Sequence, residues 1–222
     1  SAPVTGDAAA VAAAVVTLRK GRVLAVRGIG GYHLLCDARD EDAVCRLRQR
    51  KRRPDKPLAV MFPQGGDDGL DAAREELEID SVTAEALRDP ARAIVLSPRR
   101  ADGRLAPSVA PGLSEIGAFL PYSPLHHLLL GAFRGPVVAT SGNVSGEPVL
   151  TDPAEAEARL ATVADAFLHH DRPILRPADD SVLRIAAGRA RPIRLGRGVA
   201  PLELELPAEL PEPVVAVGGH LK

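Results

Sequence analysis

Cysteine is scarce in this sequence. Cys36 and Cys45 are the two cysteines among 222 residues, and neither belongs to a C-x-x-C pattern or stands beside a histidine pair. This arrangement argues against a disulfide framework and against the usual zinc-binding spacings. We therefore expect a cytoplasmic protein, kept in a reducing compartment, whose residues ligate no structural metal.

Aromatic residues and long apolar runs are also rare. Tryptophan is absent, there are two tyrosines and four phenylalanines, and the formal net charge is −1. The chain thus has few aromatic side chains on which nucleic-acid bases could stack, and it has no excess of positive charge. A nucleic-acid partner is therefore not expected. The longest near-apolar run, residues 8–18, is rich in alanine and too short to cross a bilayer. We expect no membrane partner.

The residues that are present fit one sizeable globular domain, with 45% hydrophobic and 26% charged residues. Helix and strand patterns alternate along the chain. Helices are expected at residues 7–19 and 41–50, and from Ser123 and Asp152 onward. Strands are expected at residues 23–26, 32–36, 57–62, 93–96, 136–140, 166–169, 181–187 and 191–195, the last two as a hairpin around Gly188. Residues 67–89 are predicted to be an acidic surface stretch, and a proline-punctuated loop is predicted after residue 96.

The densest charged feature is residues 46–56, which contain seven cations and one aspartate. Cations at a helix C-terminus stabilise the helix dipole by about 0.3–1 kcal/mol each, which explains two or three of them but not seven. Two prolines stiffen the exit from this helix, so Lys51, Arg53 and Lys56 are expected to aim at one polyanion. Because the P-loop pattern G-x-x-x-x-G-K-[ST] is missing, the pattern predicts phosphate binding by side chains. The alternative is a solvated helix face.

Two further polar motifs lie at strand ends. Residues 140–146, T-S-G-N-V-S-G, follow an apolar strand. Ligands gather at the carboxyl ends of strands in open α/β sheets, so these side chains suit phosphate or ribose oxygens, although an ordinary turn uses the same residue types. Asp179 and Asp180 open the late hairpin and would hold Mg²⁺ or orient a basic side chain across the site; the alternatives are a salt bridge or a turn cap. The His126-His127 and His169-His170 pairs diverge and are not expected to share a metal.

Three segments resemble, in order and spacing, the successive motifs of the YrdC/threonylcarbamoyl-adenylate synthase superfamily. They are Y-H-L-L-C-D-A at 32–38, K-x-R-P-x-K-P-L at 51–58, and S-x-N-x-S-G at 141–146. Within that superfamily, four segments resemble the YrdC-like domain of the HypF family, the carbamoyltransferases of hydrogenase maturation. These are G-G-Y-H-L at 30–34, L-P-Y-S-P-L-H-H-L-L at 120–129, T-S-G-N at 140–143, and D-D-S-V at 179–182.

The resemblance implies a YrdC-like α/β fold, with a twisted mixed sheet flanked by helices around a concave, positively charged cavity. It places a nucleotide-binding, adenylating domain at residues 1–198 and a linker at 199–213. Residues 214–222 resemble the opening of the Kae1-like domain that follows in the HypF family.

The resemblance also implies an activity. ATP with Mg²⁺ and carbamate, derived from carbamoyl phosphate, would give carbamoyl adenylate and pyrophosphate. The Kae1-like domain of the same full-length chain would then carbamoylate the C-terminal cysteine of HypE. Lys51 and Arg53 would be catalytic, and together with Lys56 they would hold the triphosphate or carbamate. Further nucleotide contacts are implied for Thr140, Ser141, Asn143, Ser181 and Arg194, and less strongly for Arg197.

Three alternatives remain open at the level of the sequence. A threonylcarbamoyl-adenylate synthase of tRNA modification would use threonine and bicarbonate with the same phosphate motif. An O-carbamoyltransferase of antibiotic pathways would have a related domain but a small-molecule acceptor. A double-stranded RNA-binding module would depend on the basic cluster alone, and a steep salt dependence of RNA affinity would identify it.

Overall fold

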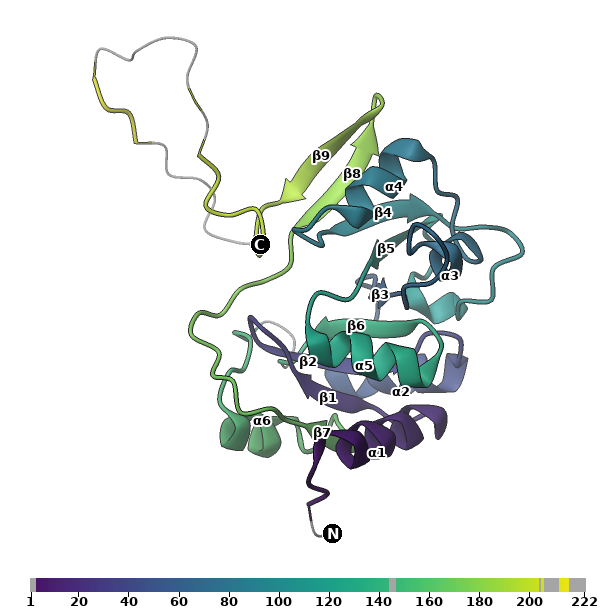
Figure 1. The fold of residues 1–222 in the computed structure, drawn as a ribbon, viewed down its shortest axis with the longest axis vertical. Helices are drawn as coiled ribbons and strands as arrows, with labels where there is room; N and C mark the ends of the chain where they lie inside the picture. The colour runs from purple at the N-terminus through teal and green to yellow at the C-terminus, as the bar shows by residue number, and fades with distance from the viewer. Residues whose placement is uncertain (1–2, 144–146, 204, 206–211, 216–222) are drawn as a thin grey trace.

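The computed structural model describes residues 3–143, 147–203, 205 and 212–215. Its centre is a mixed nine-stranded sheet with the order β7-β1-β2-β6-β3-β5-β4-β8-β9 (Figure 1). Three pairs are parallel, β1 with β7, β3 with β5 and β4 with β8, and the others are antiparallel. The strands are β1 (Leu24–Arg27), β2 (Tyr32–Asp37), β3 (Ala59–Met61), β4 (Ile94–Pro98), β5 (Glu115–Phe119), β6 (Val137–Ser141), β7 (Ala166–Leu168), β8 (Val182–Ala186) and β9 (Arg189–Arg194).

Helices cover both faces of this sheet. They are α1 (Asp7–Arg19), α2 (Glu41–Lys51), α3 (Asp71–Arg74), α4 (Ser81–Arg88), α5 (Pro124–Phe133), α6 (Pro153–Leu160) and the 3₁₀ turn η1 (Pro107–Val109). On one face α1 and α5 lie side by side against β1, β2 and β6 (Figure 1). On the other face α2, α3, α4 and α6 bury the larger core cluster. The predicted mixed sheet flanked by helices is therefore confirmed.

Alternation of side chains along the strands creates the two cores. In β1, Leu24 and Val26 belong to the α1/α5 core, whereas Ala25 belongs to the opposite core. Successive strand residues point to opposite faces, so a strand that is covered on both faces is apolar throughout. The core contains mostly aliphatic side chains, as the scarcity of aromatic residues requires.

Three predicted helix starts are confirmed by their caps. The side chains of Asp40, Ser123 and Asp152 accept hydrogen bonds from the backbone N–H three residues later. Such a cap satisfies one of the N–H groups that the first helical turn leaves without a partner. The hairpin of β8 and β9 around Gly188 is also confirmed, with Gly188 in the left-handed region at φ 67°.

Two predicted segments need correction. The stretch 67–89 is not only acidic surface, because it contains α3 and α4 and buries Leu70, Leu77 and Leu87. The loop predicted after residue 96 contains the five-residue strand β5, which is inside the sheet between β3 and β4. The short E-I-G-A-F segment has a central glycine, which weakens any strand signal in the sequence. Of residues 214–222, which resemble the opening of a Kae1-like domain, only 214 and 215 belong to the described residues.

The connection from β7 to β8 is long and positions the site. It begins at one edge of the sheet and reaches β8 near the opposite edge (Figure 1). Its last residues, Ala178 to Asp180, come close to the glycine turn before β2, where Ala178 N donates to Gly30 O at 3.0 Å. Among the described residues, no helix is long and apolar enough to cross a membrane.

Candidate functional site

A cavity of about 440 Å³ opens on the sheet face that carries α1 and α5, beyond the part that these helices cover. This volume falls within the range of small-molecule sites. The cavity extends over β2, β6, β3, β5, β4 and β8. Its polar lining consists of Tyr32, His33, Arg53, Ser114, Glu115, Thr140, Ser141, Asp179, Asp180, Arg184 and Arg194.

Small residues form the floor of the cavity. The strand register pairs Ala59 of β3 with Ala139 of β6 on one side and with Gly117 of β5 on the other. A Cβ atom on Gly117 would come within 2.8 Å of Ile94 Cγ2, so this position requires glycine. Three adjacent strands thus present little side-chain volume at one level of the sheet. The resulting space has an apolar base that suits a flat ring.

The basic cluster divides into scaffold and site. Arg48 is buried, and its guanidinium donates to the carbonyls of Arg53, Pro54 and Lys56 at 2.8–3.1 Å. Arg50 is similarly engaged, with an ion pair to Asp165 at 3.0 Å. These contacts hold the turn that follows α2. They also explain why the cluster has more cations than helix-dipole stabilisation or phosphate binding requires.

Lys51 is buried at the end of α2, with 1% of its surface exposed. Its Nζ donates to the carbonyls of Ser141 and Asn143 at 2.5 and 2.6 Å and to Asn143 Oδ1 at 2.9 Å. Burial, together with the charge of Arg53, lowers the pKa of Lys51 to about 7. The three oxygen acceptors favour the charged ammonium. Lys51 therefore ties the end of α2 to the chain that leaves β6 and lies behind the cavity wall.

Two arginines bring positive charge to the cavity itself. Arg53 follows α2 and Arg194 ends β9, and both line the cavity. Burial lowers the pKa of Arg53, and the neighbouring charges of Arg48 and Arg194 lower it further. Arg194 Nε donates to Asp180 O at 2.9 Å, which fixes its direction. Two guanidinium groups that repel each other across a cavity form a site that an anion stabilises.

The end of β6 supplies hydroxyl groups beside these cations. Thr140 and Ser141 line the cavity, and Ser141 Oγ donates to Asn143 Oδ1 at 2.6 Å. Gly142 lies so close to β2 that a Cβ atom would come within 2.5 Å of Tyr32 Cβ. The glycine of the predicted motif thus allows the turn after β6 to pack against β2. Residues 144–146 of the same motif lie outside the described residues.

Not every residue predicted for the site lies at the cavity. Lys56 is exposed and Asn143 supports Lys51, and neither lines the cavity wall. Ser181 is fully buried; its hydroxyl donates to Arg197 O at 3.1 Å and accepts from Gly196 N at 2.8 Å. The structure brings Arg53, Thr140, Ser141 and Arg194 together at the cavity, whereas Lys51, Asn143 and Ser181 form the layer behind it.

A second polar group joins two cavity residues, Asp180 and His33, to Arg197 and Tyr122, and the sequence predictions include only Asp180 and Arg197 of these four. Arg197 donates to Asp180 Oδ1 at 2.9 Å, and its guanidinium carbon lies 3.5 Å from the ring centre of Tyr122. The other oxygen of Asp180, Oδ2, is 3.8 Å from His33 Nε2. Asp180 thus forms an ion pair with Arg197, which is the salt-bridge alternative for the paired aspartates. His33 and Tyr122 belong to the motifs quoted above, but only the fold brings them together.

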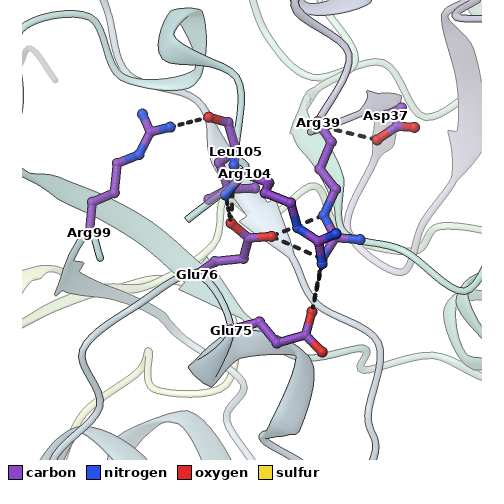
Figure 2. Close-up of polar contacts among 7 residues, drawn as sticks. All are labelled: Asp37, Arg39, Glu75, Glu76, Arg99, Arg104 and Leu105. Atoms are coloured by element: carbon purple, nitrogen blue, oxygen red, sulfur yellow. Dashed lines mark hydrogen bonds and ion pairs between the residues drawn. The ribbon is translucent and has the colours of Figure 1, made fainter. Parts of the chain in front are cut away.

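A buried carboxylate anchors the loop that leads to the cavity rim (Figure 2). Glu76 has no exposed surface; it accepts from Arg39 Nε at 2.9 Å and from the backbone N–H groups of Arg104 and Leu105 at 2.5 and 3.0 Å. Charge-assisted bonds of this kind stabilise a loop that has no regular structure. The loop continues into Ser114 and Glu115, which line the cavity.

The fold and this site define the class of the protein. A family model described as "Telomere recombination", which covers Sua5, YciO and YrdC proteins, matches residues 16–196. The chain therefore belongs to the Sua5/YciO/YrdC family, and its mixed sheet has the YrdC-like fold.

Within this family the chain is similar to HypF carbamoyltransferases. It is 47% identical over 228 residues to carbamoyltransferase HypF of Rhodobacter capsulatus, covering 100% of this chain and 29% of that protein. It is 44% identical over 209 residues to HypF of Synechocystis sp. PCC 6803, covering 94% and 27%. A crystal structure of full-length HypF in a phosphate- and nucleotide-bound form matches with a TM-score of 0.82 and 38% identity, over 87% of this chain and 30% of that one. The chain thus spans less than a third of the length of these relatives.

Proposed function

We propose that this domain catalyses ATP-dependent formation of carbamoyl adenylate, as the adenylating part of a HypF-type carbamoyltransferase. The observation that carries the proposal is the cavity that joins Arg53 and Arg194 to the hydroxyls of Thr140 and Ser141. Such a lining is suited to phosphate oxygens, and it occurs in a chain that is 47% identical to a HypF protein. The nucleotide-bound HypF structure further supports a nucleotide as the ligand.

The proposed reaction needs no covalent nucleophile. A carbamate oxygen attacks the α-phosphorus of ATP, a new oxygen–phosphorus bond forms, and the bond to the β-phosphate oxygen breaks. Carbamoyl adenylate and pyrophosphate are the products, and no proton is transferred. Carbamate itself is a poor electrophile, and adenylation gives its carbon a good leaving group. The protein's task is to align two anions and to stabilise the charge that develops on the departing pyrophosphate.

The residues of the cavity divide this task. We assign Arg53 and Arg194 to the triphosphate, because planar guanidinium groups bind phosphate oxygens through paired hydrogen bonds. Thr140 and Ser141 donate their hydroxyls to the same phosphates. The small floor of Ala59, Ala139 and Gly117 receives the base or ribose. Lys51 lies behind the cavity wall and does not contact the nucleotide; its ammonium holds Ser141 in place through the Ser141 carbonyl.

Magnesium is assigned to the substrate. Within the described part of the chain, no group of three or more His, Cys, Asp or Glu side chains is arranged to hold a metal ion. We propose that Mg²⁺ enters as Mg-ATP, bound chiefly by the triphosphate. Its contribution is to neutralise charge on the leaving pyrophosphate.

The remaining steps belong to a longer protein. We propose that residues 1–198 form the adenylating domain, that 199–213 are a linker, and that 214–222 begin a Kae1-like domain. That domain would transfer the carbamoyl group to the C-terminal cysteine of HypE, which is the proposed downstream partner. Carbamate would be derived from carbamoyl phosphate.

Pyrophosphate release tests the proposed function. With Mg-ATP radiolabelled in the γ-phosphate, addition of fresh ammonium carbamate or of carbamoyl phosphate is expected to release labelled pyrophosphate. Chromatography separates it from inorganic phosphate, which carbamoyl phosphate itself releases on hydrolysis to carbamate. Threonine plus bicarbonate, run in parallel, is expected to release none. Release with threonine plus bicarbonate alone would assign the chain to threonylcarbamoyl-adenylate synthesis instead. Absence of release with every donor would contradict adenylation by this chain.

A further inference from the structure

Three carboxylates, those of Glu115, Asp179 and Asp180, line a cavity that we assign to anionic phosphates. Glu115 forms an ion pair with Arg184 at 2.6 Å. Asp180 lines the same cavity as Arg53 and Arg194, and its side chain keeps 15% of its surface exposed. A negative group beside bound phosphates lowers affinity through like-charge repulsion. Asp180 is compatible with phosphate binding on two conditions. A cation must neutralise its charge, and its carboxylate must accept a hydrogen bond from the ligand.

Arg197 supplies the compensation but uses only half of the carboxylate. The guanidinium donates to Asp180 Oδ1 at 2.9 Å and also to the backbone carbonyls of Ala91 and Arg92 at 3.2 and 3.0 Å. Tyr122 stacks against its face at 3.5 Å. Arg197 is therefore fixed on several sides. No described residue donates a hydrogen bond to Asp180 Oδ2, which is left to accept from a ligand.

His33 is the second acceptor at this point. It lines the cavity, lies directly across the β2–β6 pair from Ser141, and places Nε2 3.8 Å from Asp180 Oδ2. Burial lowers the pKa of His33, so the imidazole is neutral near pH 7 and retains one nitrogen that accepts. Nε2 has one lone pair, and the Tyr122 hydroxyl lies 3.3 Å from it. A ligand N–H takes the place of this long contact, because the hydroxyl hydrogen of a tyrosine can rotate away.

We propose that Asp180 and His33 recognise the amino group of the carbamoyl unit, and so select carbamate over small acids that lack N–H donors. The inference rests on the proposed function. A carbamoyl nitrogen has two N–H donors, and a nitrogen at ordinary hydrogen-bond distance from both acceptors fits across their separation of 3.8 Å. Because Ser141 is the neighbour of His33 in the sheet, the amino group meets these acceptors while the phosphates contact the hydroxyls of β6. The two residues form no covalent bond and act on specificity.

Two stable analogues of the acyl adenylate test this assignment. N-carbamoylsulfamoyl adenosine carries the amino group, and N-acetylsulfamoyl adenosine has a methyl group in its place. Isothermal titration of the 222-residue chain with each gives a preference ratio. We expect the carbamoyl analogue to bind roughly tenfold more tightly, as one or two hydrogen bonds to a prepared site imply.

Variants assign that preference to residues. In Asp180→Asn and His33→Leu the ratio is expected to fall toward one while affinity for the acetyl analogue is kept. Asp171→Asn and His127→Leu, at exposed positions outside the cavity lining, are the matched controls and are expected to keep the ratio. If Asp180→Asn fails to fold, which circular dichroism would reveal, His33→Leu still decides the question.

The outcomes separate the two proposals. If neither analogue binds the unmodified chain, the proposed adenylation fails and this inference fails with it. If both bind equally well, the adenylate site stands and recognition of the amino group is wrong. If the variants weaken both analogues by the same factor, Asp180 and His33 contact the ribose or support the fold, and the inference is again overturned.

Discussion

Arg53 differs from its neighbours in the basic cluster because its guanidinium reaches the cavity. Arg48 and Arg50 donate to protein oxygens, and Arg52 is exposed in a left-handed conformation at φ 53°. One hydrogen bond of Arg53, to Pro57 O at 3.0 Å, keeps it in place. Its remaining donors are available to phosphate oxygens.

Replacing Arg53 should therefore weaken ATP binding selectively. A charge-assisted hydrogen bond to phosphate contributes about 1.5–3 kcal/mol, so Arg53→Ala is expected to lower ATP affinity by roughly ten- to a hundredfold. Isothermal titration with Mg-ATP measures the change. Arg52→Ala is the matched control and should bind ATP like the unmodified chain. Equal affinities for all three proteins would remove Arg53 from the phosphate site.

For single residues, the sequence predicts which side chains belong to the site region better than it predicts what each side chain contacts. The motifs contain Arg53 and Ser141, the family resemblance adds Arg194, and the fold brings all three to one cavity. The motifs contain Lys51 and Ser181 just as clearly, yet these side chains satisfy backbone carbonyls behind it. A lysine that binds phosphate and a lysine that fixes a loop have the same sequence pattern. Only burial and hydrogen-bond partners distinguish them.

The strands β3, β5 and β6 leave room for the cavity because they have small residues at the level of its floor. Ala59 has the central place in the row, because it pairs with Ala139 on one side and Gly117 on the other. A larger side chain there would project into the cavity, which Ala59 lines beside the edge of the α1/α5 core.

Ala59→Leu is accordingly expected to block the nucleotide while leaving the fold intact. Steric overlap of this kind costs about 1–3 kcal/mol, so ATP affinity should fall roughly tenfold or more. Calorimetric ATP binding and thermal unfolding together measure the effect. Ala190→Leu, on the exposed strand β9, serves as the control. Unchanged ATP affinity in Ala59→Leu would mean that the nucleotide does not lie on this floor.

Elements with strong local signals were the ones that could be predicted. The capped helices α2, α5 and α6 begin where Asp40, Ser123 and Asp152 indicate. The strand β5 was missed because tertiary pairing with β3 and β4, and not local propensity, holds its short segment extended. The register of the central strands, which sets the cavity floor, depends on such long-range pairings and has no local signature.

Across the whole molecule, buried histidines link stability to pH. His126 is almost completely buried, and among the described residues neither ring nitrogen has a hydrogen-bond partner. Burial holds its pKa well below the ordinary value of 6.5, and the charges of neighbouring histidines and Arg197 act in the same direction. The folded state therefore keeps His126 neutral at a pH where the unfolded chain binds a proton.

It follows that the free energy of unfolding should fall as the pH drops below about 6.5, by up to about 1.4 kcal/mol per pH unit for each such group. Urea unfolding at several values between about pH 7 and 5 measures this slope. His126→Leu is expected to reduce the slope, whereas His127→Leu, at the exposed neighbouring position, should not. Identical slopes in both variants would show that His126 titrates normally.

The contacts that build the cavity join parts of the chain made at very different times during synthesis. Lys51 reaches Ser141 across 90 positions, and Arg197 reaches Ala91 across 106. A nascent chain that has left the ribosome only as far as β8 can form most of the sheet, but it lacks Arg194 and Arg197. The nucleotide can therefore bind only after the last hairpin has been synthesised, so nucleotide binding by a nascent chain indicates that the domain is complete.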